Sequence, residues 1–237
     1  MQLSLDRDSL FSYVDKQASC FFPDNYRFEG SDVRSSFEEA LERLEYCFQF
    51  ISFPAYCDKG KQTYFSHLHS DQYAQFLYFF SNTLWIRTQK KELCDKLINL
   101  NKVINGFFLS YKGRFPDVFF LGHPVGSVLG NADYSNFLVV FQNVTINTGR
   151  TTDDPYPKLG KALFCAAGAK IIGEKPIGDR VSLGVDALVY DTEVINDSVV
   201  ERRADGQCVV RQRRARQCMA QNYFNVDVDT YIRKYEV

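Results

Sequence analysis

The sequence predicts an α+β protein, in which an N-terminal α-helical domain is followed by a left-handed parallel β-helix of hexapeptide repeats. Apolar residues recur every three or four positions in the first half and every six positions in most of the second. This change of period indicates that two kinds of structure follow each other in one chain. We place the boundaries at 1–112 for the helical domain, 113–205 for the β-helix and 206–237 for a C-terminal extension.

The first half contains four segments with helical spacing. They cover residues 8–18, 33–51, 71–88 and 91–105. Ser70 and Asp71 are placed to cap the third helix. Its part from 75 to 85 is apolar on nearly every side, so we expect it to pack among helices or against another subunit. Glycine and proline in YKGRFPD, residues 111–117, end the helical region.

The second half carries the six-residue repeat. Compact apolar residues recur at this interval, with one interruption, at Tyr134, Val140, Ile146, Leu159, Cys165, Ile171, Ile177, Leu183, Val189 and Ile195. A period of six fits neither a helix nor an alternating strand, but it fits a coil in which each repeat is one short strand and one corner. We expect these side chains to fill a narrow triangular prism. The interruption at 147–158, NTGRTTDDPYPK, predicts a loop extruded from a corner.

Three motifs stand in a fixed order within this region: GHPVGSVLGN at 122–131, FQNVTIN at 141–147 and YPKLGKALFCAAGAKIIG at 156–173. Through them the chain resembles the catalytic half of serine acetyltransferases and of related enzymes that acetylate cell-surface sugars. The resemblance covers about residues 115–200. It implies an acyltransferase that moves acetyl from acetyl-CoA to a hydroxyl group, needs no metal and assembles as a homotrimer. The apolar helix at 76–85 offers a way to pair trimers into a hexamer.

The resemblance assigns the general base to His123, one of only three histidines in the chain. Transfer to a hydroxyl needs a base that takes the hydroxyl proton and then protonates the departing thiolate, and imidazole, which ionises near neutral pH, suits both steps. Asp117 and Asp133 are the nearest carboxylates in the sequence, and we name Asp117 as the partner that would orient the ring. No cysteine or serine is recognisably paired with a second base, so transfer is expected to be direct.

Two positions depart from the serine acetyltransferases. Gly122 stands where those enzymes carry an acidic residue before the histidine, and Tyr156 stands where their HPK sequence has its histidine. We therefore predict a sugar hydroxyl of a capsule or lipopolysaccharide as the acceptor, with Tyr156, His69 and Asp71 near it. Serine O-acetylation is the alternative, and a non-catalytic β-helix scaffold is an alternative of another class. A carbonic anhydrase on the same fold is disfavoured, because its zinc needs several coil histidines.

The resemblance also places acetyl-CoA in the groove between the coils of neighbouring subunits. Small residues allow its pantetheine arm to approach the strand backbone closely. The matching positions are Asn147, Ala167, Gly168 and Val185, with Lys170 as a partner for a CoA phosphate.

Composition limits the other partners. A net charge of −1 gives no general attraction to nucleic acid or to an anionic membrane. Seven cysteines without a CxxC pair indicate reduced thiols, and with no apparent signal peptide or spanning segment we expect a cytoplasmic protein. The basic stretch 202–217 is either a solvated edge or a docking patch for the CoA 3′-phosphate or an anionic polysaccharide. The His67 and His69 pair lacks the further ligands of a metal site.

Overall fold

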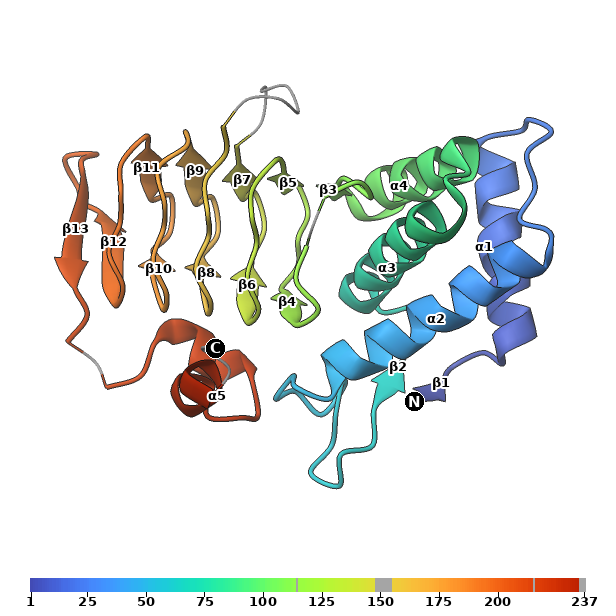
Figure 1. Cartoon of the computed structure of the whole chain (residues 1–237), viewed down its shortest axis with the longest axis horizontal. Coiled ribbons are helices and arrows are strands. Elements are labelled where there is room, and N and C mark those ends of the chain that lie inside the picture. The colour runs from blue at the N-terminus through green and yellow to red at the C-terminus, as the bar shows by residue number, and fades with distance from the viewer. Residues whose placement is uncertain (114, 148–154, 215, 235–237) are drawn as a thin grey trace.

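The structure, a computed structural model, describes every residue except 114, 148–154, 215 and 235–237. It confirms the predicted order, a helical region followed by a parallel β-solenoid (Figure 1). No described helix combines the length and the apolar character that crossing a membrane requires.

Four long helices form the N-terminal part, close to the predicted ranges: α1 (Arg7–Phe21), α2 (Ser31–Phe48), α3 (Ser70–Thr88) and α4 (Lys91–Asn105). Two short strands, β1 (Gln2–Leu3) and β2 (Tyr64–Phe65), pair in parallel beside them. Helix α3 packs against α2, α4 and the first strands of the coil, so its side chains are buried continuously from Asp71 to Leu84. The expectation that this helix pairs trimers is therefore wrong, because its own chain already covers its apolar surface.

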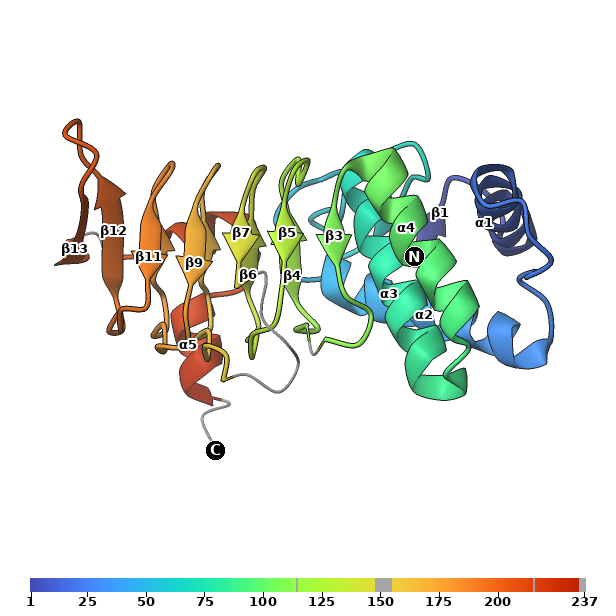
Figure 2. The same ribbon diagram turned by 90° about the horizontal axis from the view of Figure 1, so that it is seen from above.

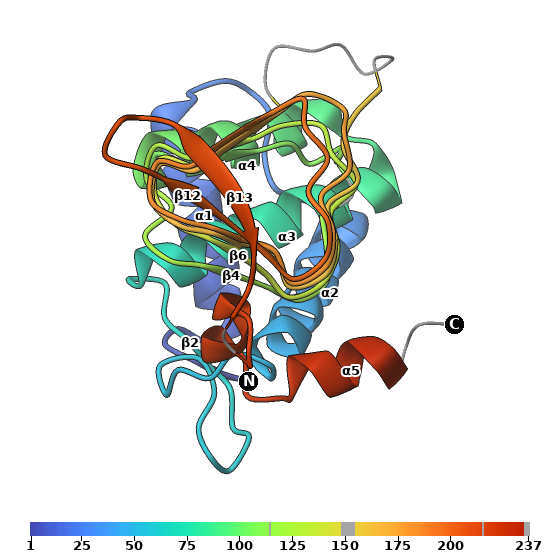
Figure 3. The same cartoon turned by 90° about the vertical axis from the view of Figure 1, so that its left-hand side faces the viewer.

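The β-helix has two hydrogen-bonded sheets. The first sheet contains β4 (Phe119–Leu121), β6 (Leu138–Val140), β8 (Phe164–Cys165), β10 (Ser182–Leu183), β12 (Ser198–Arg202) and β13 (Cys208–Gln212). The second sheet contains β3 (Phe108–Leu109), β5 (Val128–Leu129), β7 (Thr145–Ile146), β9 (Lys170–Ile172) and β11 (Leu188–Tyr190), which lie in a row in Figure 2. The third side is held by isolated bridges such as Leu159–Ile177. Seen from its end, the coil is triangular (Figure 3).

The three corners of this triangle run along the coil as three edges. The first edge, from the first sheet to the second, contains residues 122–127, 141–144, 166–169 and 184–187. The second edge follows the second sheet at 130–132, 147, 173 and 191. The third edge leads back to the first sheet at 135–137, 160–162, 178–180 and 195–197. All three edges contain residues with φ in the left-handed region, such as Asp186 (54°), Asp191 (42°) and Asp197 (60°).

The β-helix extends beyond the predicted boundaries at both ends. Strand β3 lies before residue 113 and pairs with β5, while β13 lies after residue 205 and pairs with β12. At the N-terminal end only two residues separate α4 from β3, because the left-handed Gly106 ends that helix and turns the chain into the strand.

The predicted inward positions fill the prism with one exception. Val140, Cys165 and Leu183 are fully buried, but Ile195 is 60% exposed and Val194, at 1%, is buried in its place. The bridge between Ile177 and Val194 shows the cause, since the chain turns the preceding corner with one residue fewer than the repeat predicts.

The C-terminal extension is part of the same body. After β13 the chain returns through the 3₁₀ helix η1 (Met219–Tyr223) to α5 (Val228–Lys234). The extension is joined to the end of α2 by the bridge between Ile51 and Phe224 and by a hydrogen bond from Ser52 N to Tyr223 O, 2.9 Å. It therefore ties the helical part to the coil.

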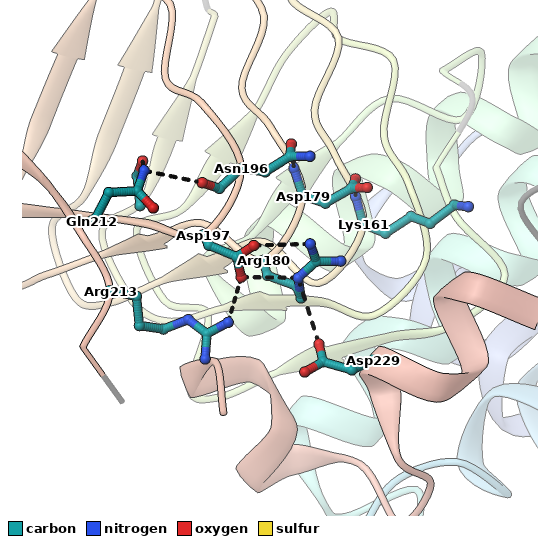
Figure 4. Close-up of polar contacts among 9 residues, drawn as sticks. Lys161, Asp179, Arg180, Asn196, Asp197, Gln212, Arg213 and Asp229 are labelled. Carbon is teal, nitrogen blue, oxygen red and sulfur yellow. Dashed lines mark hydrogen bonds and ion pairs between the residues drawn. The ribbon is translucent and has the colours of Figure 1, made fainter. Parts of the chain in front are cut away.

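Charged side chains fix the extension to the third edge (Figure 4). Asp197 accepts hydrogen bonds from Arg180 Nη2 at 2.9 Å and from Arg213, and Asp229 of α5 lies 3.5 Å from Arg180 Nε. The two guanidinium groups hold the pKa of Asp197 at about 2, and the same pairing raises the pKa of Arg180.

Candidate active site

His123 lies on the first edge, directly after β4. Its backbone has φ of 48°, a left-handed value that is unfavourable for a residue with a side chain. Strain of this kind is often found at functional sites, where the surrounding structure holds it in place. Its side chain is 82% exposed, so the imidazole projects from the edge into solvent.

Asp71 of α3 is the carboxylate beside this imidazole. Its Oδ2 accepts a hydrogen bond from His123 N at 3.0 Å and lies 3.3 Å from His123 Nδ1. The Asp71 side chain is only 6% exposed, and its other oxygen lies 3.2 Å from Ser70 Oγ. Nδ1 is therefore the ring nitrogen that faces this carboxylate.

This contact revises two sequence-based predictions. Helix α3 begins after His69 and has no side-chain cap, so Asp71 does not serve as its cap. Asp71, which we expected near the acceptor, lies beside the His123 ring, in the place that we predicted for Asp117. Asp117 is exposed, and among the described residues Asp71 is the carboxylate within 4 Å of the His123 ring. Asp133 lies next to the second edge, where its backbone forms a parallel β-bridge with Lys158.

The remaining histidines lie near the N-terminus of α3. The half-buried His69 precedes the helix, its ring is 5.5 Å from that of Tyr56, and its Nδ1 has no hydrogen-bond partner. Tyr56 is 3% exposed and its hydroxyl is likewise unpartnered, while burial, with the charge of Asp71, raises its pKa. The Nδ1 atom of His67, in contrast, lies 2.8 Å from Ser4 Oγ. Within the described parts of the chain, no cluster of three or more metal-binding side chains occurs.

The packing around position 122 explains why a glycine stands there. A Cβ at this position would lie 2.7 Å from Cε1 of Phe141, closer than real contacts allow. The Phe141 ring is in turn held by Phe164 and by Tyr223 of η1, with ring centroids 5.8 and 5.7 Å away. An acidic side chain before His123 would therefore require this aromatic cluster to move.

The residues predicted to bind acetyl-CoA fall on two different edges. Ala167, Gly168 and Val185 lie on the first edge with His123, and Val185 is 64% exposed. Lys170 lies on the outer face of the second sheet, where its ammonium donates to Gly168 O at 2.8 Å. Asn147 lies on the second edge, is 2% exposed and donates from Nδ2 to Asn131 O at 2.7 Å.

Tyr156 lies away from His123 within one chain. It lines a cavity of about 210 Å³ together with residues of the second edge, including Asn131 and Ala132. The preceding loop at 148–154, predicted to reach over the acceptor, lies outside the described residues. No sequence signal linked Asp71 to His123, because the two residues belong to different domains and are 52 positions apart.

In fold and in part of its sequence, the chain is similar to serine acetyltransferases. The chain is 27% identical over 108 residues to a serine acetyltransferase of Synechococcus elongatus, covering 44% of each protein. It is 28% identical over 110 residues to that of Helicobacter pylori, covering 46% of this chain and 64% of the relative. The matched region thus spans less than half of the first relative and just under two-thirds of the second.

Solved structures agree with the fold. The serine acetyltransferase of Brucella abortus superposes with a TM-score of 0.62 at 17% identity, covering 89% of this chain and 86% of that one. The serine acetyltransferase of Vibrio cholerae superposes with a TM-score of 0.59 at 20% identity, covering 88% of this chain and 73% of that one. No protein-family model matches the chain.

Proposed function

We propose that this protein is an acetyl-CoA-dependent O-acetyltransferase with L-serine as its acceptor. The observation that carries the activity is the pairing of the exposed His123 imidazole with the buried Asp71 carboxylate on a coil edge. The acceptor follows from the relatives, which are named serine acetyltransferases. They favour serine over the surface polysaccharide that the sequence motifs first indicated.

The proposed chemistry uses the two nitrogens of His123 differently. Asp71 holds the proton on Nδ1, so Nε2 can take the proton of the acceptor hydroxyl as its oxygen bonds to the acetyl carbon. The bond between that carbon and the CoA sulfur breaks, and the proton on Nε2 passes to the thiolate. The products are the acetyl ester and CoA, and the imidazole is restored without a covalent protein intermediate.

The first edge fits the proposed donor. Two of its corners beyond His123 contain small residues, Ala166, Ala167, Gly168 and Gly184, which leave the backbone open to an extended arm. The other direction along this edge is closed by the end of α4, since Gly106 O accepts a hydrogen bond from Gly126 N at 2.8 Å. The donor is therefore expected to extend from His123 toward the C-terminal end of the coil.

A trimer would complete this site. Beside Lys170, the outer face of the second sheet exposes apolar side chains, with Leu188 42% and Tyr190 69% exposed, and no helix lies over it in Figure 2. If this face of each copy turns to a three-fold axis, the first edge of one copy lies beside the second edge of the next. The partner would then bring its second edge, with Tyr156, toward His123.

One observation favours a second acceptor. Because the Phe141 ring leaves no room for a side chain at Gly122, the position before His123 lacks the carboxylate that serine acetyltransferases carry there. A hydroxyl of a sugar is therefore the second candidate.

An assay of thiol release from acetyl-CoA tests the proposal with L-serine, free sugars, nucleotide sugars and capsular oligosaccharides as acceptors. We expect turnover with serine and a fall of about 10²- to 10⁴-fold in kcat for His123→Ala, the usual loss for a general base. Turnover confined to sugars would transfer the proposal to the second candidate. Absence of both CoA binding and turnover would favour the non-catalytic scaffold.

A further inference from the structure

The basic stretch near the C-terminus divides into three groups in the structure. Arg213 bonds to Asp197 and Arg211 to Glu201, so both serve the fold. Arg214 and Arg216 follow β13 and are exposed near the third edge. Arg202 and Arg203 lie at the turn between β12 and β13, and neither guanidinium forms an ion pair with a described residue.

This turn stands at the end of the first edge. Strand β12 continues the first sheet past Leu183, so its end corresponds to the corners at 122–127 and 184–187. There the chain does not turn into the second sheet but reverses into β13, and the hairpin projects beyond one corner of the triangle (Figure 3). The two arginines therefore overhang the line of small residues that begins at His123.

The separation matches the proposed donor. From β4 to β12 there are four steps between neighbouring strands, which amounts to about 19 Å at the usual spacing. This is comparable to the length of an extended pantetheine arm with its diphosphate. A donor that has its thioester at His123 and follows the edge would bring its ribose phosphate to the hairpin.

The local charges leave the two arginines available. The Glu201 carboxylate is neutralised by Arg211, and Asp205 turns its Oδ1 to Gln207 N at 2.9 Å. Arg202 Nη2 lies over the turn, 3.9 Å from where a Cβ on Gly206 would stand. Asp186, exposed one coil earlier, is the carboxylate on the path itself.

We propose that Arg202 and Arg203 bind the 3′-phosphate of CoA. The inference rests on the proposed function and adds a phosphate site to it. Two guanidinium groups suit a phosphate because they form charge-assisted and bidentate hydrogen bonds. The site selects CoA over donors without this phosphate.

Calorimetry with CoA and 3′-dephospho-CoA on the full-length protein tests this site. The wild type is expected to bind CoA about tenfold more tightly than dephospho-CoA, as fits a few charge-assisted bonds in solvent. In Arg202→Ala/Arg203→Ala this preference should disappear through weaker CoA binding alone. The matched control Arg214→Ala/Arg216→Ala removes two exposed arginines from the opposite end of β13 and should keep it.

Equal affinity of the wild type for both ligands would overturn the phosphate site while leaving the acetyltransferase proposal intact. If Arg202→Ala/Arg203→Ala bound CoA and dephospho-CoA more weakly by the same factor, the arginines would be assigned to the diphosphate. That result would also overturn the 3′-phosphate site. If Arg214→Ala/Arg216→Ala also lost the preference for CoA over dephospho-CoA, the preference would reflect the overall positive charge of the region and not a site at Arg202 and Arg203. A wild type that binds neither ligand would instead contradict the proposed function.

Discussion

The contact between His123 and Asp71 makes the candidate site depend on two parts of the chain. The histidine comes from the coil, whereas the carboxylate comes from the first turn of a helix in the N-terminal region. Because its side chain is only 6% exposed and faces the ring, we assign Asp71 the role of orienting the imidazole. It is a positioning residue in the proposed mechanism.

Asp71→Asn should therefore lower kcat much more than it raises KM for either substrate. The amide has nearly the same shape but can donate a hydrogen bond to Nδ1, which would place the proton on the wrong nitrogen. We expect a loss of about 10²-fold or more in kcat, measured by thiol release under saturation, with partial recovery in Asp71→Glu.

Asp117→Asn provides the comparison, since it neutralises an exposed carboxylate six residues before His123. Its kcat should stay within about twofold of the wild type, because surface charges act weakly at a distance. A loss equal to that of Asp71→Asn would return the orienting role to Asp117.

At the residue scale the sequence could single out His123 as a candidate, but it could not predict the residues around it. His123 was found because its motif is local. Asp71 became its partner through the packing of α3 against β4, and Gly122 is explained by Phe141 and Tyr223, which belong to distant segments. Contacts between such segments depend on tertiary packing, and a pattern read along the chain does not contain them.

At the level of elements, periodicity predicted the helices and nearly every inward strand position. It failed at Ile195, because a corner with one residue fewer shifts each following residue. It also placed the start of the coil too late, since Phe108 and Leu109 are too short a strand to show a period. The docking of the C-terminal extension could not be predicted either, because it depends on separate charged and aromatic contacts.

The ion pairs of Asp197 give this docking a predicted pH dependence. The pKa of Asp197 is about 2 in the folded protein against 3.8 for an unperturbed group. Because the folded value is the lower one, the stabilisation is complete above pH 3.8 and is lost as the pH falls through about 2. The side chain is one third exposed, so we expect roughly 1–2 kcal/mol after allowing for screening.

Urea unfolding at fixed protein concentration should show this difference between the wild type and Asp197→Asn at pH 7. The difference should persist to about pH 4 and shrink toward zero near pH 2. Glu174→Gln, at an exposed carboxylate without an ion pair among the described residues, should give no such difference. A gap between wild type and Asp197→Asn that stays constant down to pH 2 would contradict the assignment.

At the scale of the whole molecule, the three sides of the coil differ in what covers them. The first sheet is covered by η1 through the Tyr223 ring, which lies among Phe120, Phe141 and Phe164. The second sheet presents Leu188 and Tyr190 to solvent. This contrast is the reason for assigning the second sheet to the trimer contact.

Tyr190→Glu should break the proposed trimer. A buried charge without a partner is costly, so light scattering should change from a multiple of three subunits to the 27.3 kDa monomer. Ile195→Glu, at an apolar side chain of similar exposure on the third edge, should leave the assembly unchanged. A wild type that is a fully active monomer would show that the site is not shared between copies.

The reversal at β13 has a consequence for how copies of the protein avoid joining end to end. A coil that stopped after β12 would leave a parallel strand edge open, and such an edge is a template on which further strands can polymerise into fibres. Strand β13 closes that edge in the antiparallel sense and places exposed Arg211 and Gln212 at the terminus. At the opposite end α3 and α4 cover the first strands. An antiparallel strand with exposed polar side chains thus ends the first sheet in place of β12, and this disfavours end-to-end growth there.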